Sequence, residues 1–199
     1  MTRLDVLTPA ELSPEQRALY DEIVGGPRAA GPGLLTADGS GGLIGPFNAM
    51  LYAPGVGHAL QALGAAVRYR TALPDRIREI AVLAVAAAWR SDFELYAHEA
   101  LARAAGVTDA EIEALRAGGE VPLRDEVERA ALGVVRALLL KRDLDEAGYR
   151  AARDTLGEAA LVELSTLVGY YSTIALQMRI FRVTAPGASR TSGARSAPG

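Results

Sequence analysis

Signals that start and stop helices recur along the whole chain, whereas the alternation of apolar and polar residues that marks a half-buried strand is scarce. Ser13-Pro-Glu-Gln16 combines a capping serine, a proline at the first helical position and a glutamine at the capping-box position. It starts a helix that runs to about Val24, where Gly25-Gly-Pro27 stops it. Thr108-Asp-Ala-Glu111 is a second capping box. The sequence therefore predicts an all-α fold.

The spacing of apolar residues and the positions of glycine and proline predict the other helices. We expect them at 46–52, 56–69, 74–89, 91–106, 108–118 and 127–139, between Asp143 and Gly157, and at 158–182. Two stretches, 80–89 and 161–181, are apolar on nearly every side. A lone subunit has little polar surface with which to cover both, which favours a homo-oligomer. A bundle that encloses both helices within one subunit is the alternative.

The chain of 199 residues suits a single helical domain, which we place at residues 1–183. Residues 25–45 are rich in glycine, contain proline and lack periodicity, so they predict a long surface loop. Beyond Val183 the chain consists of alanine, proline, glycine, serine, threonine and arginine. We expect a disordered tail at 184–199.

Composition narrows the classes of function. A net charge of −3 gives no electrostatic reason to expect nucleic acid or an anionic membrane as partner. The first residues lack the apolar core of a secretory signal, and the apolar run from Ile80 to Trp89 is about half of the roughly 20 residues that span a membrane. We therefore expect a cytoplasmic protein. The absence of cysteine excludes disulfides, thiol nucleophiles and thiolate metal sites.

The candidate site is the pair Glu94 and His98, four residues apart in Ser91-Asp-Phe-Glu-Leu-Tyr-Ala-His98. On a helix both side chains share one face, and a carboxylate beside an imidazole can move protons near neutral pH. Simpler interpretations compete with this one. Ser91-x-x-Glu94 is also a capping box, and His98 on a partly apolar helix can be a structural histidine. A metal site made of Glu79, Glu94 and His98 is a third interpretation, although no recognised metal-binding spacing is present.

Three segments carry a family resemblance: Arg78-Glu-Ile-Ala-Val-Leu-Ala-Val-Ala-Ala-Ala-Trp89, Ser91-x-x-Glu-x-x-x-His98 and Ala105-Gly-Val-Thr-Asp-Ala-Glu111. They resemble the carboxymuconolactone decarboxylase family, which includes the alkylhydroperoxidase D-like proteins. The resemblance extends from about residue 12 to residue 183.

The resemblance is to the branch of that family without cysteine. The peroxidase branch has two cysteines where this chain has Ser91 and Glu94, so the disulfide-based peroxidase reaction is excluded here. The decarboxylase branch has glutamate and histidine at these positions, and this chain is similar to it. The resemblance implies an alkylhydroperoxidase D-like helical bundle, a homotrimer or homohexamer, and a pocket near a subunit interface that uses no cofactor and no metal. It also implies that His98, Glu94 and the upstream Glu79 are catalytic.

These residues suggest a division of roles. We expect His98 to give or take the proton, Glu94 to orient it, and Glu79 to serve as a second acid whose pKa is raised by burial. Four further residues are substrate-binding candidates, an arginine for a substrate carboxylate and three aromatic residues for the pocket walls: Arg90, Phe47, Trp89 and Tyr96.

The predicted function is a lyase that decarboxylates a small lactone or carbonyl acid, or rearranges it through an enolate, as in the catabolism of aromatic compounds. An isomerase, dehydratase or cyclase of a biosynthetic pathway uses the same acid–base groups and is the first alternative. A helical oligomer that binds a small hydrophobic ligand without catalysis is the second, and a metal-dependent lyase is the third.

Overall fold

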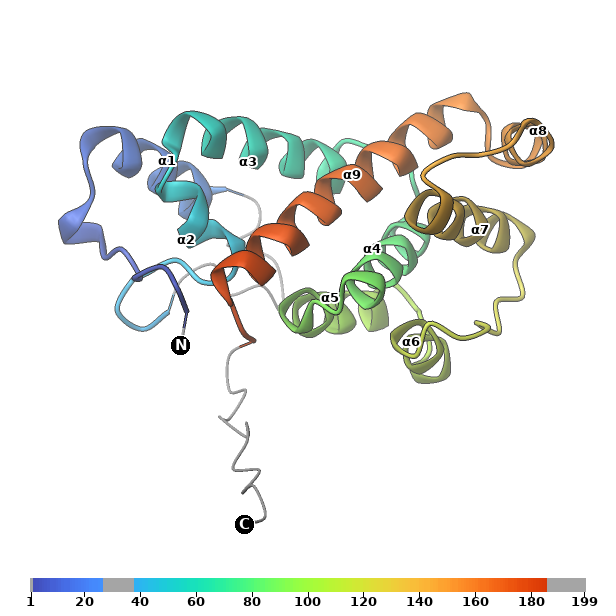
Figure 1. Cartoon of the computed structure of the whole chain (residues 1–199), viewed down its shortest axis with the longest axis horizontal. Coiled ribbons are helices and arrows are strands. Elements are labelled where there is room, and N and C mark those ends of the chain that lie inside the picture. The colour runs from blue at the N-terminus through green and yellow to red at the C-terminus, as the bar shows by residue number, and fades with distance from the viewer. Residues whose placement is uncertain (1, 27–37, 186–199) are drawn as a thin grey trace, which may run out of the picture.

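The computed structural model describes residues 2–26 and 38–185, and within these ranges every regular element is a helix (Figure 1). The helices are η1 (Pro9–Glu11), α1 (Pro14–Gly25), α2 (Pro46–Leu51), α3 (Pro54–Tyr69), α4 (Asp75–Trp89), α5 (Asp92–Ala104), α6 (Asp109–Arg116), α7 (Glu126–Lys141), α8 (Glu146–Leu156) and α9 (Glu158–Phe181). The predicted all-α class is confirmed. Residues 27–37 of the loop predicted at 25–45 lie outside the described residues, and so does nearly all of the tail predicted at 184–199.

The predicted capping boxes begin two of these helices. Ser13 accepts a hydrogen bond from the backbone N–H of Gln16 at the start of α1. Thr108 accepts one from the backbone N–H of Glu111 at the start of α6. In both capping boxes the side chain of the third helical residue, Gln16 or Glu111, accepts a hydrogen bond from the backbone N–H of the capping residue. These local bonds satisfy N–H groups that the first turn of a helix leaves without partners, which is why the helix starts were predictable.

The third predicted capping box, at Ser91 and Glu94, is absent. Ser91 is the N-cap residue of α5, but its side chain accepts no capping hydrogen bond, and its buried hydroxyl has no hydrogen-bond partner. The carboxylate of Glu94 lies within 3.4 Å of the His98 imidazole. The capping interpretation of Glu94 was therefore wrong.

Helix α4 is the centre of the fold, because it packs against α5, α6, α7 and α9. Every residue from Ile77 to Ala86 is buried. This complete enclosure explains why the sequence beyond Glu79 contains no polar residue on any face of the helix. For α4, the alternative of a bundle that encloses the helix within one subunit is the one observed.

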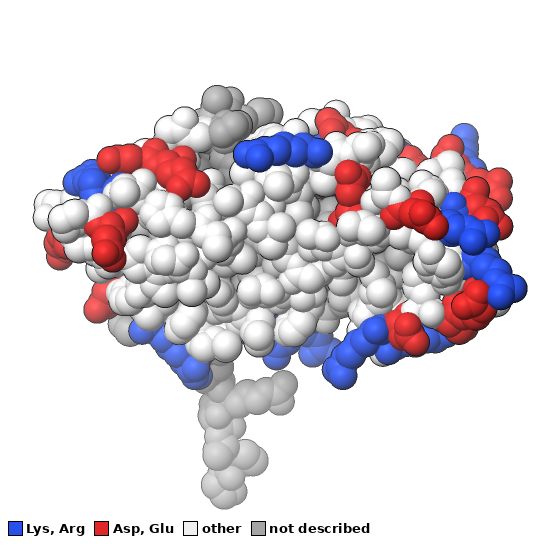
Figure 2. Space-filling model, turned by 90° about the horizontal axis from the view of Figure 1, so that it is seen from above, with Lys and Arg blue, Asp and Glu red and all other residues white. Residues whose placement is uncertain are grey.

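Helix α9 crosses the molecule obliquely and contacts α2, α3, α4, α7 and α8 (Figure 1). One side of α9 lines the core, whereas Val162, Leu176 and Ile180 are exposed. In Figure 2 the surface over α3 and α9 is a broad uncharged area between charged ends. By length and composition α9 could also cross a membrane, and 39% of its most apolar window is buried in the protein. A single helix of this kind is weak evidence for a membrane span, because core helices of soluble proteins pass the same test.

The start of α2 is fixed by a close contact between Gly45 and Phe93 of α5. Gly45 has a φ of 62°, a conformation that residues with a side chain rarely adopt. A Cβ atom on Gly45 would lie 2.2 Å from the Phe93 ring. The aromatic ring therefore occupies the space that a side chain at position 45 would need.

We expect Gly45→Ala to lower the free energy of unfolding by about 2–5 kcal/mol, the sum of left-handed backbone strain and overpacking. Gly106→Ala is the matched control, because Gly106 also has a positive φ, of 86°, but its added Cβ would meet no atom within 4 Å. The control should lose only the backbone part, about 1–2 kcal/mol. Urea unfolding of both variants measures the difference, and equal losses would contradict the described packing of Phe93.

Candidate active site

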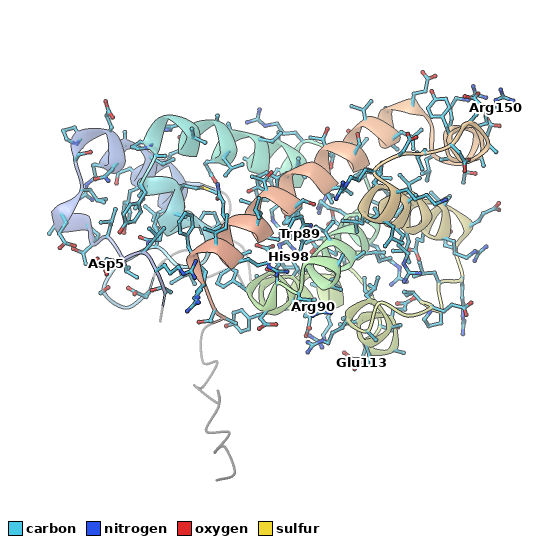
Figure 3. The ribbon with its side chains drawn as sticks, in the orientation of Figure 1. Asp5, Trp89, Arg90, His98, Glu113 and Arg150 are labelled. Carbon is cyan, nitrogen blue, oxygen red and sulfur yellow. The ribbon has the colours of Figure 1, made fainter. Side chains whose placement is uncertain are left out.

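Helices α4 and α5 bring two carboxylates to opposite edges of one imidazole. His98 of α5 lies in the interior of the protein (Figure 3), and its Nδ1 is 2.8 Å from Glu79 Oε2 of α4. Its Nε2 is 3.4 Å from Glu94 Oε2, one helical turn away on α5. All three side chains are nearly inaccessible to solvent. The result is a buried carboxylate–imidazole–carboxylate row.

Glu79 is held in its ionised form. Burial alone would raise the pKa of Glu79, but the His98 imidazole and two arginines outweigh it and lower the pKa below its ordinary value of 4.5. The arginines are Arg68 of α3, 3.3 Å from Glu79 Oε1, and Arg78 of α4, 3.9 Å from the same oxygen. The prediction that burial keeps Glu79 protonated was therefore wrong, because it took no account of these cations.

The ionised Glu79 determines which nitrogen of His98 carries a proton. A carboxylate only accepts hydrogen bonds, so the 2.8 Å contact requires a proton on Nδ1. Nε2 then faces Glu94, whose Oε2 lies 3.4 Å away. Glu79 thus makes the hydrogen bond that can orient His98, a role that the sequence interpretation assigned to Glu94. Glu94 instead faces the pocket together with His98.

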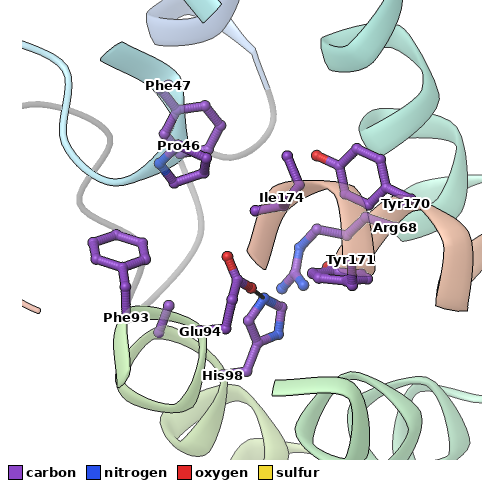
Figure 4. Close-up of a pocket in the computed structure, with 10 residues that line it drawn as sticks. Pro46, Phe47, Arg68, Phe93, Glu94, His98, Tyr170, Tyr171 and Ile174 are labelled. Carbon is purple, nitrogen blue, oxygen red and sulfur yellow. Dashed lines mark ion pairs between the residues drawn. The ribbon is translucent and has the colours of Figure 1, made fainter. Parts of the chain in front are cut away.

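A small pocket lies against the Glu94–His98 pair (Figure 4). Its walls include aromatic and apolar side chains from α2, α5 and α9, together with the Arg68 guanidinium, and the principal ones are Phe47, Arg68, Phe93, Tyr170, Tyr171 and Ile174. Its volume is about 30 Å³, which holds about two water molecules. Glu79 does not line the pocket, which is consistent with its place behind His98.

Burial affects the pKa of two side chains that line the pocket, Tyr171 and Arg68. Burial, followed by the nearby Glu94, raises the pKa of Tyr171 far above its ordinary range, so its hydroxyl keeps its proton. The Tyr171 ring meets the His98 ring edge to face at 5.2 Å. Burial disfavours the charge of Arg68, but the pKa of its guanidinium is raised because the negative charge of Glu79 lies beside it, and the guanidinium stays positive. The pocket therefore combines one fixed cation with the side chains of Glu94 and His98.

The structure brings one of the four substrate-binding candidates to this pocket. Phe47 lines it, whereas Arg90, Trp89 and Tyr96 do not. Arg90 is exposed and lines a separate surface groove with Arg116 and Arg136. Trp89 donates a hydrogen bond to Ser172 on α9, and Tyr96 is 47% exposed. The cation of the pocket is Arg68, not the predicted Arg90.

Arg68 was missed because it lies 30 residues before His98 in the sequence. A signal for it was present nevertheless. Gln61, Gly64 and Arg68 recur at intervals of three and four residues on the buried side of α3, beside the apolar Val67. A long cation on a buried helix face needs an acidic partner, so its position alone pointed to an internal ion pair.

The geometry also bears on the metal-site interpretation. Glu79 and Glu94 approach opposite nitrogens of the same imidazole, so their oxygens do not converge on one point with a histidine nitrogen. Among the described residues, no group of three or more histidine, aspartate or glutamate side chains is arranged to hold a metal ion.

The fold is similar to that of three solved bacterial proteins. An uncharacterized peroxidase-related protein from Ralstonia eutropha JMP134, described as an alkylhydroperoxidase AhpD core, aligns with a TM-score of 0.73 at 16% identity, covering 94% of this chain and 93% of that one. A peroxidase-related protein from Silicibacter sp. TM1040 aligns with a TM-score of 0.70 at 15% identity, over 92% and 91%. A putative antioxidant defence protein AhpD from Agrobacterium tumefaciens aligns with a TM-score of 0.61 at 22% identity, over 71% and 98%.

These alignments establish an alkylhydroperoxidase D-like helical fold. The model of the carboxymuconolactone decarboxylase family matches residues 54–137, a range that holds Arg68, Glu79, Glu94 and His98. The part of the chain that carries the acid–base residues is therefore similar to the carboxymuconolactone decarboxylase family, and the resemblance drawn from the sequence is confirmed over these residues. A search of curated protein sequences finds no match.

Proposed function

We propose that this protein is a cofactor-free acid–base enzyme of the carboxy-lyase type, which acts on a small lactone or carbonyl acid through an enolate. The observation that supports this most strongly is the buried row of Glu79, His98 and Glu94, which ends at a pocket with a fixed arginine. Catalytic acids and bases need such burial and such partners to exchange protons near neutral pH.

The residues account for each step of a decarboxylation. The bond between carbon and the departing carboxylate breaks, CO₂ leaves, and the electron pair moves into the conjugated carbonyl group to form an enolate. Arg68 binds the acidic substrate and stabilises the developing oxyanion. The proton held between Nε2 of His98 and Glu94 passes to the substrate carbon, and the pair recovers a proton from solvent. Glu79 keeps the imidazole in the correct orientation and tautomer throughout.

The same groups also serve isomerisation, dehydration or ring closure of a carbonyl compound through an enolate. The reaction class is therefore tested directly by steady-state turnover of 4-carboxymuconolactone with the purified protein. Release of one CO₂ per substrate consumed supports the lyase. Proton exchange or isomerisation without CO₂ assigns the same site to another enolate reaction. Saturable binding with no chemical change supports instead a non-catalytic ligand-binding protein.

Arg68→Met should lower kcat/KM for an acidic substrate by about 10- to 100-fold, because a hydrogen bond to a charged group contributes about 1.5–3 kcal/mol. Arg90→Met is the matched control: it removes the same charge from the exposed arginine outside the pocket and should leave kcat/KM unchanged. Steady-state kinetics of the two variants decides between the two arginines. An equal loss in both, or a loss in Arg90→Met alone, would contradict the role of Arg68.

We also propose that the chain assembles with copies of itself, as a homotrimer or homohexamer, in the cytoplasm. The exposed apolar side chains of α3 and α9, among them Val56, Leu63, Val162, Leu176 and Ile180, support a contact surface there. Sizing with light scattering at micromolar concentration tests the assembly, and a single species near the subunit mass of 20.9 kDa would contradict it.

A further inference from the structure

The pocket beside His98 is smaller than any substrate that the proposed chemistry requires. Its volume of about 30 Å³ admits about two water molecules. A carbonyl acid carries at least a carboxylate and a carbonyl group, and its carbon skeleton needs further space. The neighbouring walls must therefore open before any substrate reaches Glu94 and His98.

A second, larger cavity adjoins this pocket. This outer groove has a volume of about 250 Å³. It lies between the first residues of the chain, the segment before and within α2, and the residues that follow α9. Its walls are mainly apolar, and none of the described residues that line it is charged. The apolar members include Leu4, Val6, Leu43, Ile44, Ala49 and Val183. An uncharged, apolar group is the occupant that such walls favour.

Phe93 is the residue that lines both cavities. Its ring rests on Gly45, where the missing side chain leaves the space that the ring fills. The ring also lies 6.5 Å from that of Tyr96, which is 47% exposed, so one neighbour of Phe93 borders on solvent. Phe93 directly precedes Glu94 in α5, so the residue that lines both cavities is next to the acid–base pair in the chain.

We propose that the inner pocket and the outer groove form a single substrate chamber, divided by the ring of Phe93 in this conformation, and that the outer groove holds an apolar substituent of the substrate. When the ring turns aside, an acid can place its carboxylate at Arg68 and extend its carbon chain past Gly45 into the groove. This inference rests on the proposed function for the role of the inner pocket. It specifies the substrate class as an amphipathic carbonyl acid with an uncharged tail of several carbons.

Unreactive straight-chain acids test the chamber without any turnover. We expect isothermal titration calorimetry to show Kd falling by about fourfold for each methylene added between butanoate and octanoate, the increment expected for burial of one CH₂ group. A Kd that does not depend on chain length would overturn the inference.

Two substitutions in the outer groove locate the tail. Ala49→Phe and Thr184→Trp each fill part of the groove and should abolish the fall in Kd between butanoate and octanoate. Thr184 is exposed, so its substitution does not depend on repacking of the core. Ala62→Phe, at an exposed position of α3 outside both cavities, is the control and should retain the full dependence. Retention in all three variants would overturn the inference.

Two further variants test the connection between the cavities. Arg68→Met should weaken butanoate and octanoate by the same factor, because both place the carboxylate in the inner pocket. Octanoate binding that is insensitive to Arg68→Met would mean that the tail binds apart from the acid–base site.

Phe93→Leu should raise the association rate constant of octanoate, measured by stopped-flow displacement of fluorescent 2-naphthoate, and an unchanged rate would remove Phe93 as the partition. Since none of these measurements requires catalysis, a failure of the proposed lyase reaction is distinguishable from a failure of the chamber.

Discussion

His98→Gln should lower kcat/KM for the proton-transfer reaction by about 100- to 10,000-fold, the usual contribution of a general acid or base. Glutamine is close to histidine in reach and can still bind Glu79, but it neither stores nor delivers a proton near neutral pH. The substitution therefore removes proton transfer while leaving a hydrogen-bonding group in the buried position. Circular dichroism and light scattering should show an unchanged helical content and assembly state.

The chain offers a closely matched control for this substitution. His58 of α3 contacts Glu22 Oε2 through Nδ1 at 2.8 Å, the same atoms and the same distance as the His98–Glu79 contact. The side chains of His58 and Glu22 are each more than 40% exposed, and neither lines the pocket. His58→Gln should leave kcat/KM unchanged. Comparable losses in both variants, or full activity in His98→Gln, would remove His98 from the mechanism.

The parts of the fold that the sequence could predict are those set by local interactions. The starts of α1 and α6 depend on hydrogen bonds that span three residues, and the approach of Glu94 to His98 depends on one helical turn. Each of these is contained within a short stretch of sequence. The failure at Ser91 has a tertiary cause, because Glu94 points into the pocket beside His98 instead of back along its own helix.

The parts of the site that could not be predicted depend on which helix faces which. Glu79 of α4 and His98 of α5 meet between two helices, and Arg68 reaches Glu79 from α3. Burial was anticipated for Glu79, and on its own it argues for a neutral carboxylic acid. The direction of the pKa shift depends on His98 and Arg68, which other helices supply, and on Arg78, so the sequence interpretation gave Glu79 the wrong protonation state.

The charge of Glu79 should also make it a major determinant of stability. It lies within 4 Å of three groups that carry or can carry positive charge, on His98, Arg68 and Arg78, and all four side chains are at least largely buried. Glu79→Gln removes the carboxylate that pairs with Arg68 and with Nδ1 of His98, whereas Arg78 keeps its ion pair with Asp75. Removal of one partner from a buried ion pair typically costs about 3–5 kcal/mol, and we expect a loss of that size in the free energy of unfolding at pH 7.

The pH dependence distinguishes this electrostatic effect from a packing defect. The pKa of Glu79 is lowered in the folded protein relative to its ordinary value of 4.5, so the ionised carboxylate stabilises the fold above about pH 4.5 and loses this contribution as the pH falls through the folded pKa. The wild type should therefore lose stability below pH 4.5 more steeply than Glu79→Gln, and the difference between them should shrink with acidification. Urea unfolding between pH 3 and pH 7 measures this, with the exposed Glu113 (Figure 3) changed to glutamine as the control, which should stay within about 0.5 kcal/mol of wild type. A loss in Glu79→Gln that is the same at every pH would show that the substitution acts through packing, and would remove the argument that Glu79 is the ionised partner that orients His98.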